Sequence, residues 1–138
     1  MALKLRVKKE TIEISYREDN DNPDSKVLAT FFVSPMTPTE LETCMKKHEK
    51  KEWISPNRKT KKELVKDINF MEVQKDRIVA TIVDWKGIED TNGKALKCSD
   101  ENKLAVWEHN SEVINWVIEQ VEIIQEGNED QKATEVKN

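Results

Sequence analysis

The chain contains two cysteines and two histidines, and these four side chains are its candidates for metal or thiol chemistry. Cys44 and His48 lie four residues apart, so a helix would place both on one face. Cys98 and His109 each stand alone, and the close Cys and His pairs of a zinc finger are missing. We therefore predict no metal site, and we interpret Cys44 as a core residue and Cys98 as a residue beside a strand or a helix cap.

Catalytic machinery is also not indicated by the sequence. Nucleophilic catalysis needs a nucleophile, a general base and a group that orients the base. Neither histidine follows a glycine-rich elbow or stands beside a motif Ser or Cys, and no phosphate-binding loop, dinucleotide fingerprint or metalloprotease motif is present. We predict a protein that is not an enzyme, with no catalytic residue and no cofactor.

A calcium loop is the remaining chemical pattern, and it is incomplete. Asp90, Asn92 and Glu101 stand at positions 1, 3 and 12 of such a loop. Lys94 occupies the fifth position, and Ala95 occupies the sixth, where a glycine is required. The sequence therefore predicts no calcium site.

The N-terminal part has the period-two pattern of β-strands. Apolar residues alternate with polar ones from Leu3 to Tyr16, and Val27–Val33 is a second β-rich run. The polar segment 17–25 between them contains Pro23 and several Asx residues, as is typical of a turn or loop. We predict that the two runs pair as antiparallel strands.

A helix start follows at Thr37-Pro38-Thr39-Glu40. Thr37 suits the N-cap, Pro38 the first helical position and Glu40 the third, where Thr and Glu side chains satisfy free backbone N–H groups. We predict a helix from Pro38 to Glu52. Ser55 precedes a proline, which disfavours helical backbone, so residues 53–57 should end this helix and 58–62 should form a basic loop.

The segment 62–88 suits two structures. Its apolar residues fit a helical stripe that Gly87 would end, and its length without an internal Gly or Pro favours a helix. Ile78, Ala80 and Ile82 would equally suit a strand, so residues 76–84 stay open between helix and strand.

Three further features complete the chain. Thr91-Asn92-Gly93 predicts a tight turn in which Asn-Gly supplies positive φ angles. Ser99 should cap a short helix to Trp107, and a last helix should run over 111–125 and end at Gly127. The polar segment 127–138 predicts a disordered C-terminus.

Together these elements predict an α+β fold: an N-terminal β-hairpin or small antiparallel sheet followed by packed helices, in one domain over residues 1–126. The hydrophobic share of 36% is modest, and it is matched by a charged share of 36%, so much of the chain must be solvated. The N-terminal MALKLRVKKE has no apolar signal core, and no apolar run is long enough for a membrane span. We expect the cytoplasm.

Charge is unevenly distributed. Residues 46–66 include nine basic and three acidic residues, a local charge of +6; because the whole chain carries −4, the rest carries −10. A solvent-exposed loop over residues 46–66 is one explanation for this cluster of basic residues. The alternative is a nucleic-acid-binding loop in which Lys59, Lys61 and Lys62 contact phosphates and Trp53 stacks on a base. A pI of 5.4 and the lack of a known nucleic-acid-binding signature count against that alternative.

The segment Asp84–Gly93, DWKGIEDTNG, carries a family resemblance. With the FFVSPMTPTELE segment upstream (Phe31–Glu42), it resembles small prophage-encoded tail assembly chaperones, in which an apolar segment ends in D-W-x-G-[IV]-x-D-x-x-G. The resemblance spans Val27–Gln125 and rests on residues that set shape. It implies a non-catalytic factor that binds a tail protein, such as the tape measure or tube subunit, in the cytoplasm of the bacterial host.

A structural component of the virion tail is the alternative that the same resemblance allows. For the contact surface with a partner we predict four large side chains. Trp116 also lies on an apolar stripe typical of a core residue, whereas Trp53 lies in a segment too polar to bury it easily. The four residues are Met36, Met45, Trp53 and Trp116.

Overall fold

The computed structural model describes residues 2–57 and 60–137, and the side chains of 50–66 and 127–137 lie outside that description. The contacts within the chain divide it into two compact units. We call Met1–Pro35 with Ile78–Asn138 the sheet unit, and Met36–Arg77 the hairpin unit. The prediction of a single domain over 1–126 stays a prediction.

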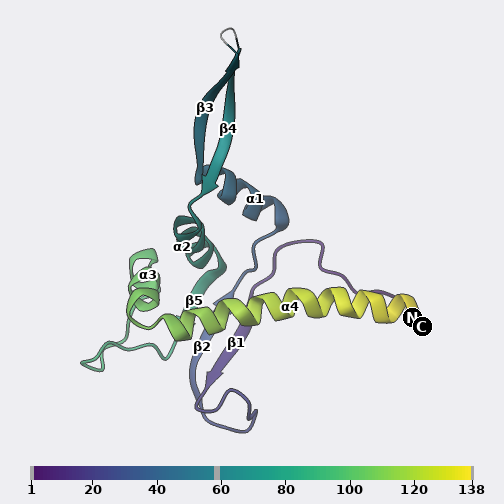
Figure 1. Cartoon of the computed structure of the whole chain (residues 1–138). Coiled ribbons are helices and arrows are strands. Elements are labelled where there is room, and N and C mark those ends of the chain that lie inside the picture. Colours follow the sequence, from purple (N-terminus) through teal and green to yellow (C-terminus); the bar gives the residue numbers. More distant parts are fainter. Residues whose placement is uncertain (1, 58–59, 138) are drawn as a thin grey trace. The chain divides into compact units, whose positions relative to one another are not determined.

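The sheet unit is built on three antiparallel strands in the order β1-β2-β5 (Figure 1). They are β1 (Ile12–Arg17), β2 (Val27–Val33) and β5 (Ile82–Lys86). Phe31 on the central strand pairs with Ile14 on one side and Trp85 on the other, and all three side chains are buried. The predicted pairing of the first two strands is confirmed, with the first strand shorter than expected.

The expected strand over Leu3–Val7 is wrong, because β1 begins only at Ile12. Ile12 pairs with Val33, the last residue of β2, so no partner backbone continues beside the preceding residues. Without a partner strand, the apolar side chains of residues 3–7 have no sheet face to cover. Val7, for example, is 94% exposed.

Two consecutive helices complete the sheet unit: α3 (Asp100–His109) and α4 (Ser111–Lys137). Ser99 caps α3 as predicted, accepting a hydrogen bond from the Asn102 backbone N–H at 3.2 Å. The buried face of α4 joins the sheet in one hydrophobic cluster, to which it contributes Ile114, Val117, Ile118 and Val121. The helix end expected at Gly127 is wrong, since the α4 backbone continues to Lys137.

A buried lysine links α3 to the end of α2 (Phe70–Thr81). Lys103 donates to the Val79 carbonyl at 3.1 Å and pairs with Asp100 at 3.3 Å. Val79 lies in the last turn of α2, where carbonyls lack helical partners and a cation is favourable. This contact satisfies a helix C-terminus that has no basic residue of its own.

The hairpin unit opens with α1 (Pro38–Lys47), whose capping box is confirmed. The Glu40 backbone N–H donates to Thr37 Oγ1, and the Thr37 N–H donates to Glu40 Oε1, both at 3.2 Å. The helix ends at Lys47 with His48 as its C-cap, so the predicted extension to Glu52 is wrong.

Two antiparallel strands follow, β3 (Glu49–Asn57) and β4 (Thr60–Ile68), which form a sheet of their own (Figure 1). The predicted helix end over 53–57 is wrong because these residues are in β3, and the predicted basic loop is wrong for residues 60–62, which are in β4. Residues 58 and 59 of that predicted loop lie outside the described residues. The segment 62–88 is likewise divided among β4, α2 and β5, so a helix is confirmed only for its middle part. Backbone pairing with β2 makes residues 82–86 a strand.

The described residues confirm the α+β class, with a small N-terminal antiparallel sheet and packed helices. Among those residues, no helix combines the length and the apolar character needed to cross a bilayer.

Candidate functional site

The segment Asp84–Gly93 is anchored in the core of the sheet unit by Trp85. Its side chain is 5% exposed and meets the Phe31 ring edge to face at 6.4 Å. The indole Nε1 donates to the Leu96 carbonyl at 2.9 Å, so the strand is tied to the chain beyond the turn. The predicted core position of Trp85 is therefore confirmed.

The following turn is organised by Asp90. Its Oδ1 accepts hydrogen bonds from the backbone N–H groups of Asn92 at 2.8 Å and Lys94 at 3.0 Å. Gly93 takes a φ of +79°, whereas no described non-glycine residue has a positive φ, so the prediction for Asn92 is wrong. The Asp90 carboxylate thus shapes the loop by an Asx turn.

A groove of about 570 Å³ lies in the sheet unit, and the consecutive residues 87–91 form part of its wall. Strand residues and α3 supply much of the remaining lining. The apolar part of the lining includes Tyr16, Leu28, Ile88, Leu96, Val106 and Val113. Glu89, Asp90, His109 and Asn110 are polar residues of the same groove. A mostly apolar groove with a few polar groups is the usual form of a binding site.

The predicted contact residues fall in different places. Trp116 is half-buried and meets the Tyr16 ring edge to face at 5.1 Å, so it packs behind a residue that lines the groove. Met36 and Met45 are half-buried in the hairpin unit. The side chains of Trp53, Lys61 and Lys62, and the whole of Lys59, lie outside the described residues. The role of all these residues in binding stays a prediction.

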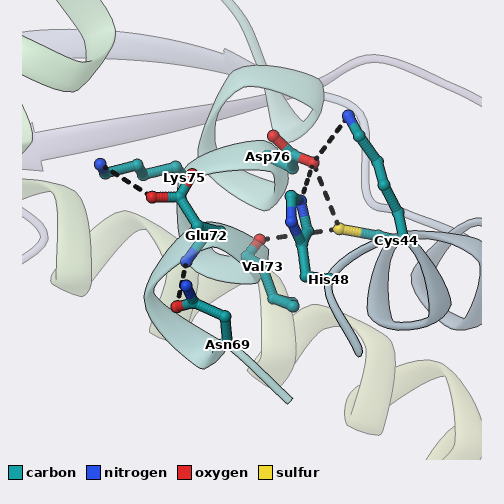
Figure 2. Close-up of polar contacts among 8 residues, drawn as sticks. Cys44, His48, Asn69, Glu72, Val73, Lys75 and Asp76 are labelled. Atoms are coloured by element: carbon teal, nitrogen blue, oxygen red, sulfur yellow. Dashed lines mark hydrogen bonds and ion pairs between the residues drawn. The ribbon is translucent and has the colours of Figure 1, made fainter. Parts of the chain in front are cut away.

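The hairpin unit holds a second candidate site, a cluster around the carboxylate of Asp76 (Figure 2). Asp76 Oδ2 lies 2.7 Å from His48 Nε2, 3.8 Å from Cys44 Sγ and 3.4 Å from Lys47 Nζ. Helix α1 and its cap supply Cys44, Lys47 and His48, and α2 supplies Asp76. Cys44 is buried, and its thiol also lies 3.8 Å from the Val73 carbonyl.

The environment sets the charge state of two of these groups. The hydrogen bond from His48, followed by the nearby Lys47 ammonium, holds the pKa of Asp76 below its usual value. Burial, reinforced by the Asp76 charge, raises the pKa of the Cys44 thiol. Asp76 is thus an anion at neutral pH, and Cys44 is a protonated thiol that is a poor nucleophile.

The Asp76 carboxylate should make the stability of the protein depend on acid pH. Because its pKa is lowered in the folded state, its contribution is fully present above the unfolded pKa of about 3.9 and is lost as pH falls through the folded pKa. When the free energy of unfolding is plotted against pH in chelator-treated buffer, the parent should lose stability at acid pH. The Asp76→Asn variant should lack the part of that decrease that comes from Asp76. Since 37% of the Asp76 side chain is exposed, screening keeps the effect modest.

Asp24→Asn, in the exposed loop between β1 and β2, is the control and should keep the slope of the parent. An Asp76→Asn variant with an unchanged slope would show that this ion pair does not favour the folded state.

The four residues first considered for metal binding are not brought together as one set. Cys44 and His48 lie in the hairpin unit, whereas the half-buried Cys98 and the exposed His109 belong to the sheet unit. Asp76 was missed because it lies 28 residues from His48, and no local pattern links the two. The i, i+4 spacing of Cys44 and His48 was the one available signal.

The structure thus defines a small α+β protein with an open groove and a separate polar cluster. A family profile of the YdaY prophage proteins matches residues 41–138, which is more than half of the chain. The chain belongs to this family and is a prophage protein. No curated protein and no solved structure gives a significant match to it.

Proposed function

We propose that the chain is a non-catalytic assembly factor of the phage tail, acting in the host cytoplasm by holding a segment of a tail protein such as the tape measure or tube subunit. One observation carries the proposal: residues 87–91, within the segment that resembles tail assembly chaperones, form part of the groove wall. Family membership supports a phage context. A holding factor needs a binding surface and no catalytic group.

The groove chemistry indicates the kind of segment it takes. Leu28, Ile88 and Val106 offer apolar contacts to an apolar side chain of the partner. Glu89 and Asp90 place carboxylates beside them, which favours a partner with a nearby Lys or Arg. The proposed partner segment is therefore short and apolar, with an adjoining basic residue.

Two alternative functions remain: a structural component of the tail, which differs in its final location, and a nucleic-acid accessory protein, which differs in its ligand. A structural tail component would make similar contacts and remain in purified virions. A nucleic-acid accessory protein would bind through the basic 46–66 segment, whose backbone forms most of the β3–β4 hairpin. Its binding would weaken steeply with salt and would be lost on replacing Lys59, Lys61 and Lys62 with Glu.

The test is co-expression of the chain with the adjacent tail genes, followed by affinity capture. Ala105→Arg introduces a long cation at an exposed α3 position in the groove, and it should weaken capture of the tail protein at least about tenfold, which corresponds to 1.4 kcal/mol. Ala80→Arg is the matched control, since Ala80 is an exposed helical alanine outside the groove lining, and it should bind as the parent does.

Two results would contradict the proposal at different levels. If no tail protein is captured and a deletion strain forms normal tails, the assembly role is wrong. If capture succeeds but Ala105→Arg binds as tightly as Ala80→Arg, the assembly role holds and the groove is not the contact surface.

A further inference from the structure

Cys44, His48 and Asp76 gather three different ligand types from two helices of the hairpin unit (Figure 2). One ligand atom from each residue lies within 4.8 Å of the other two. We propose that these residues form a Zn²⁺ site that joins α1 to α2 at the base of the β3–β4 hairpin. The site is independent of the groove and of the proposed function.

The donor set suits zinc better than the other common biological cations. Thiolate, imidazole and carboxylate are the three ligand types that Zn²⁺ takes in proteins, whereas Mg²⁺ and Ca²⁺ prefer oxygen alone. Three protein ligands would leave a fourth position of the tetrahedron for water or for a group from a partner.

The ligand atoms lie near the spacing of a tetrahedral zinc site, and side-chain adjustments of under about 1 Å would bring them to it. Because zinc–ligand bonds measure about 2.0–2.3 Å, the ligand atoms of a tetrahedral site lie about 3.3–3.8 Å apart. The 3.8 Å between Cys44 Sγ and Asp76 Oδ2 already meets this spacing. The 2.7 Å hydrogen bond between His48 Nε2 and Asp76 must open by about 0.6 Å. The ligand atoms of Cys44 and His48 lie within 4.8 Å of each other, and zinc would hold them within about 3.8 Å.

The alternative use of the same three residues is thiol catalysis, and the geometry disfavours it. In a catalytic thiol site, the histidine takes the thiol proton with one ring nitrogen while a third group orients the other. Here a single carboxylate oxygen contacts both the His48 Nε2 atom and the Cys44 thiol, so the carboxylate lies at the centre. An ion bound between the three ligand atoms would contact all three groups.

The charges around the cluster are compatible with the binding of Zn²⁺. Binding would displace the thiol proton of Cys44 to solvent, leaving a thiolate and a carboxylate to neutralise the divalent charge. The Lys47 ammonium, 3.4 Å from Asp76, must swing away, and its side chain is 68% exposed and free to do so. The Asp76 side chain, 37% exposed, gives the ion a path from solvent.

The position of the site predicts what the ion would stabilise. His48 directly precedes β3, and its carbonyl accepts a hydrogen bond from the Asn69 N–H, just beyond β4, at 3.0 Å. An isolated two-stranded hairpin is marginally stable in water. A metal bridge between Cys44, His48 and Asp76 would close the base of this hairpin and hold the two flanking helices together.

Cobalt is the probe, because Co²⁺ replaces Zn²⁺ and reports its ligands by absorption. Titration of the full metal-free chain with Co²⁺ should give a thiolate-to-cobalt charge-transfer band and intense d–d bands of tetrahedral geometry, both lost on adding one equivalent of Zn²⁺. Cys44→Ser should abolish the charge-transfer band, and His48→Gln should weaken Co²⁺ binding at least about tenfold, because even partners that only orient a ligand contribute that much. Cys98→Ser and His109→Gln are matched controls and should titrate as the parent does.

A second measurement on the unmodified chain guards against a variant that fails to fold. One equivalent of Zn²⁺ should raise the melting temperature of the parent and of Cys98→Ser, and the same amount of Mg²⁺ should not. The proposal is overturned if the parent gives no charge-transfer band, if Cys44→Ser keeps it, or if Zn²⁺ leaves the melting temperature of the parent unchanged.

Discussion

Replacing Trp85 with alanine should lower the free energy of unfolding by about 3–5 kcal/mol, the usual cost of removing a large aromatic side chain from a core. Trp85 is 5% exposed and contacts the Phe31 ring, so the deletion leaves a cavity against the central strand. It also removes the donor to the Leu96 carbonyl. The loss is measured by urea denaturation, from the midpoint of the transition and the slope of the free energy of unfolding against urea concentration.

Two variants separate the causes of this loss. Trp85→Phe keeps much of the apolar volume but removes the indole donor, so it should cost less than Trp85→Ala. Trp107→Ala is the matched control, since Trp107 is only half-buried and donates to Asn115 at an exposed position; its cost should be clearly smaller. Equal losses for Trp85→Ala and Trp107→Ala would contradict the core role of Trp85.

Elements with local signals could be predicted from the sequence. Thr37 and Glu40 satisfy each other's backbone N–H groups within one helical turn. At the start of α3, the Ser99 side chain accepts from the Asn102 backbone N–H. The β2 strand was found with its full length because its apolar run coincides with the strand. In each of these cases the determining contacts lie within the segment itself or follow directly from its pattern.

Elements decided by pairing with distant backbone were missed. The β3–β4 hairpin consists largely of charged and polar residues, so its strand character depends on the cross-strand register, such as the pairing of Glu52 with Leu64. Residues 82–86 follow α2 without a Gly or Pro break, and they become a strand because Trp85 and Asp84 pair with β2. Periodicity within a segment carries no information about such partners.

The two candidate sites likewise combine features that local sequence predicts with features that depend on contacts between distant segments. The importance of Asp84–Gly93 for shape could be predicted, because its Gly and Asp types signal special backbone geometry. That it lines a groove could not, because most of the other lining residues come from β1, β2 and α3, which are distant in sequence. The Asp76 cluster likewise needs a contact between two helices that are separated by a whole hairpin in sequence.

Replacing Gly87 with alanine should be nearly as damaging as removing Trp85, although it adds only one carbon atom. Gly87 has a φ of +83°, a conformation in which an L residue is strained by about 1–3 kcal/mol. The added Cβ would also lie 2.8 Å from the Leu28 carbonyl oxygen and 3.2 Å from the Ala29 Cα. Both are backbone atoms of β2, so they cannot move aside without disturbing the sheet, which adds about 1–3 kcal/mol.

Gly93→Ala separates the two contributions, because Gly93 has nearly the same φ of +79° and its nearest neighbour is the end of the Glu89 side chain at 4.0 Å. Gly93→Ala should therefore show the backbone strain alone, and the difference between the two variants in urea denaturation measures the close approach to β2. Equal losses would mean that β2 yields to the added carbon. If Gly87→Ala is the more damaging, as expected, this segment needs glycine at the groove wall for packing as well as for turning the chain.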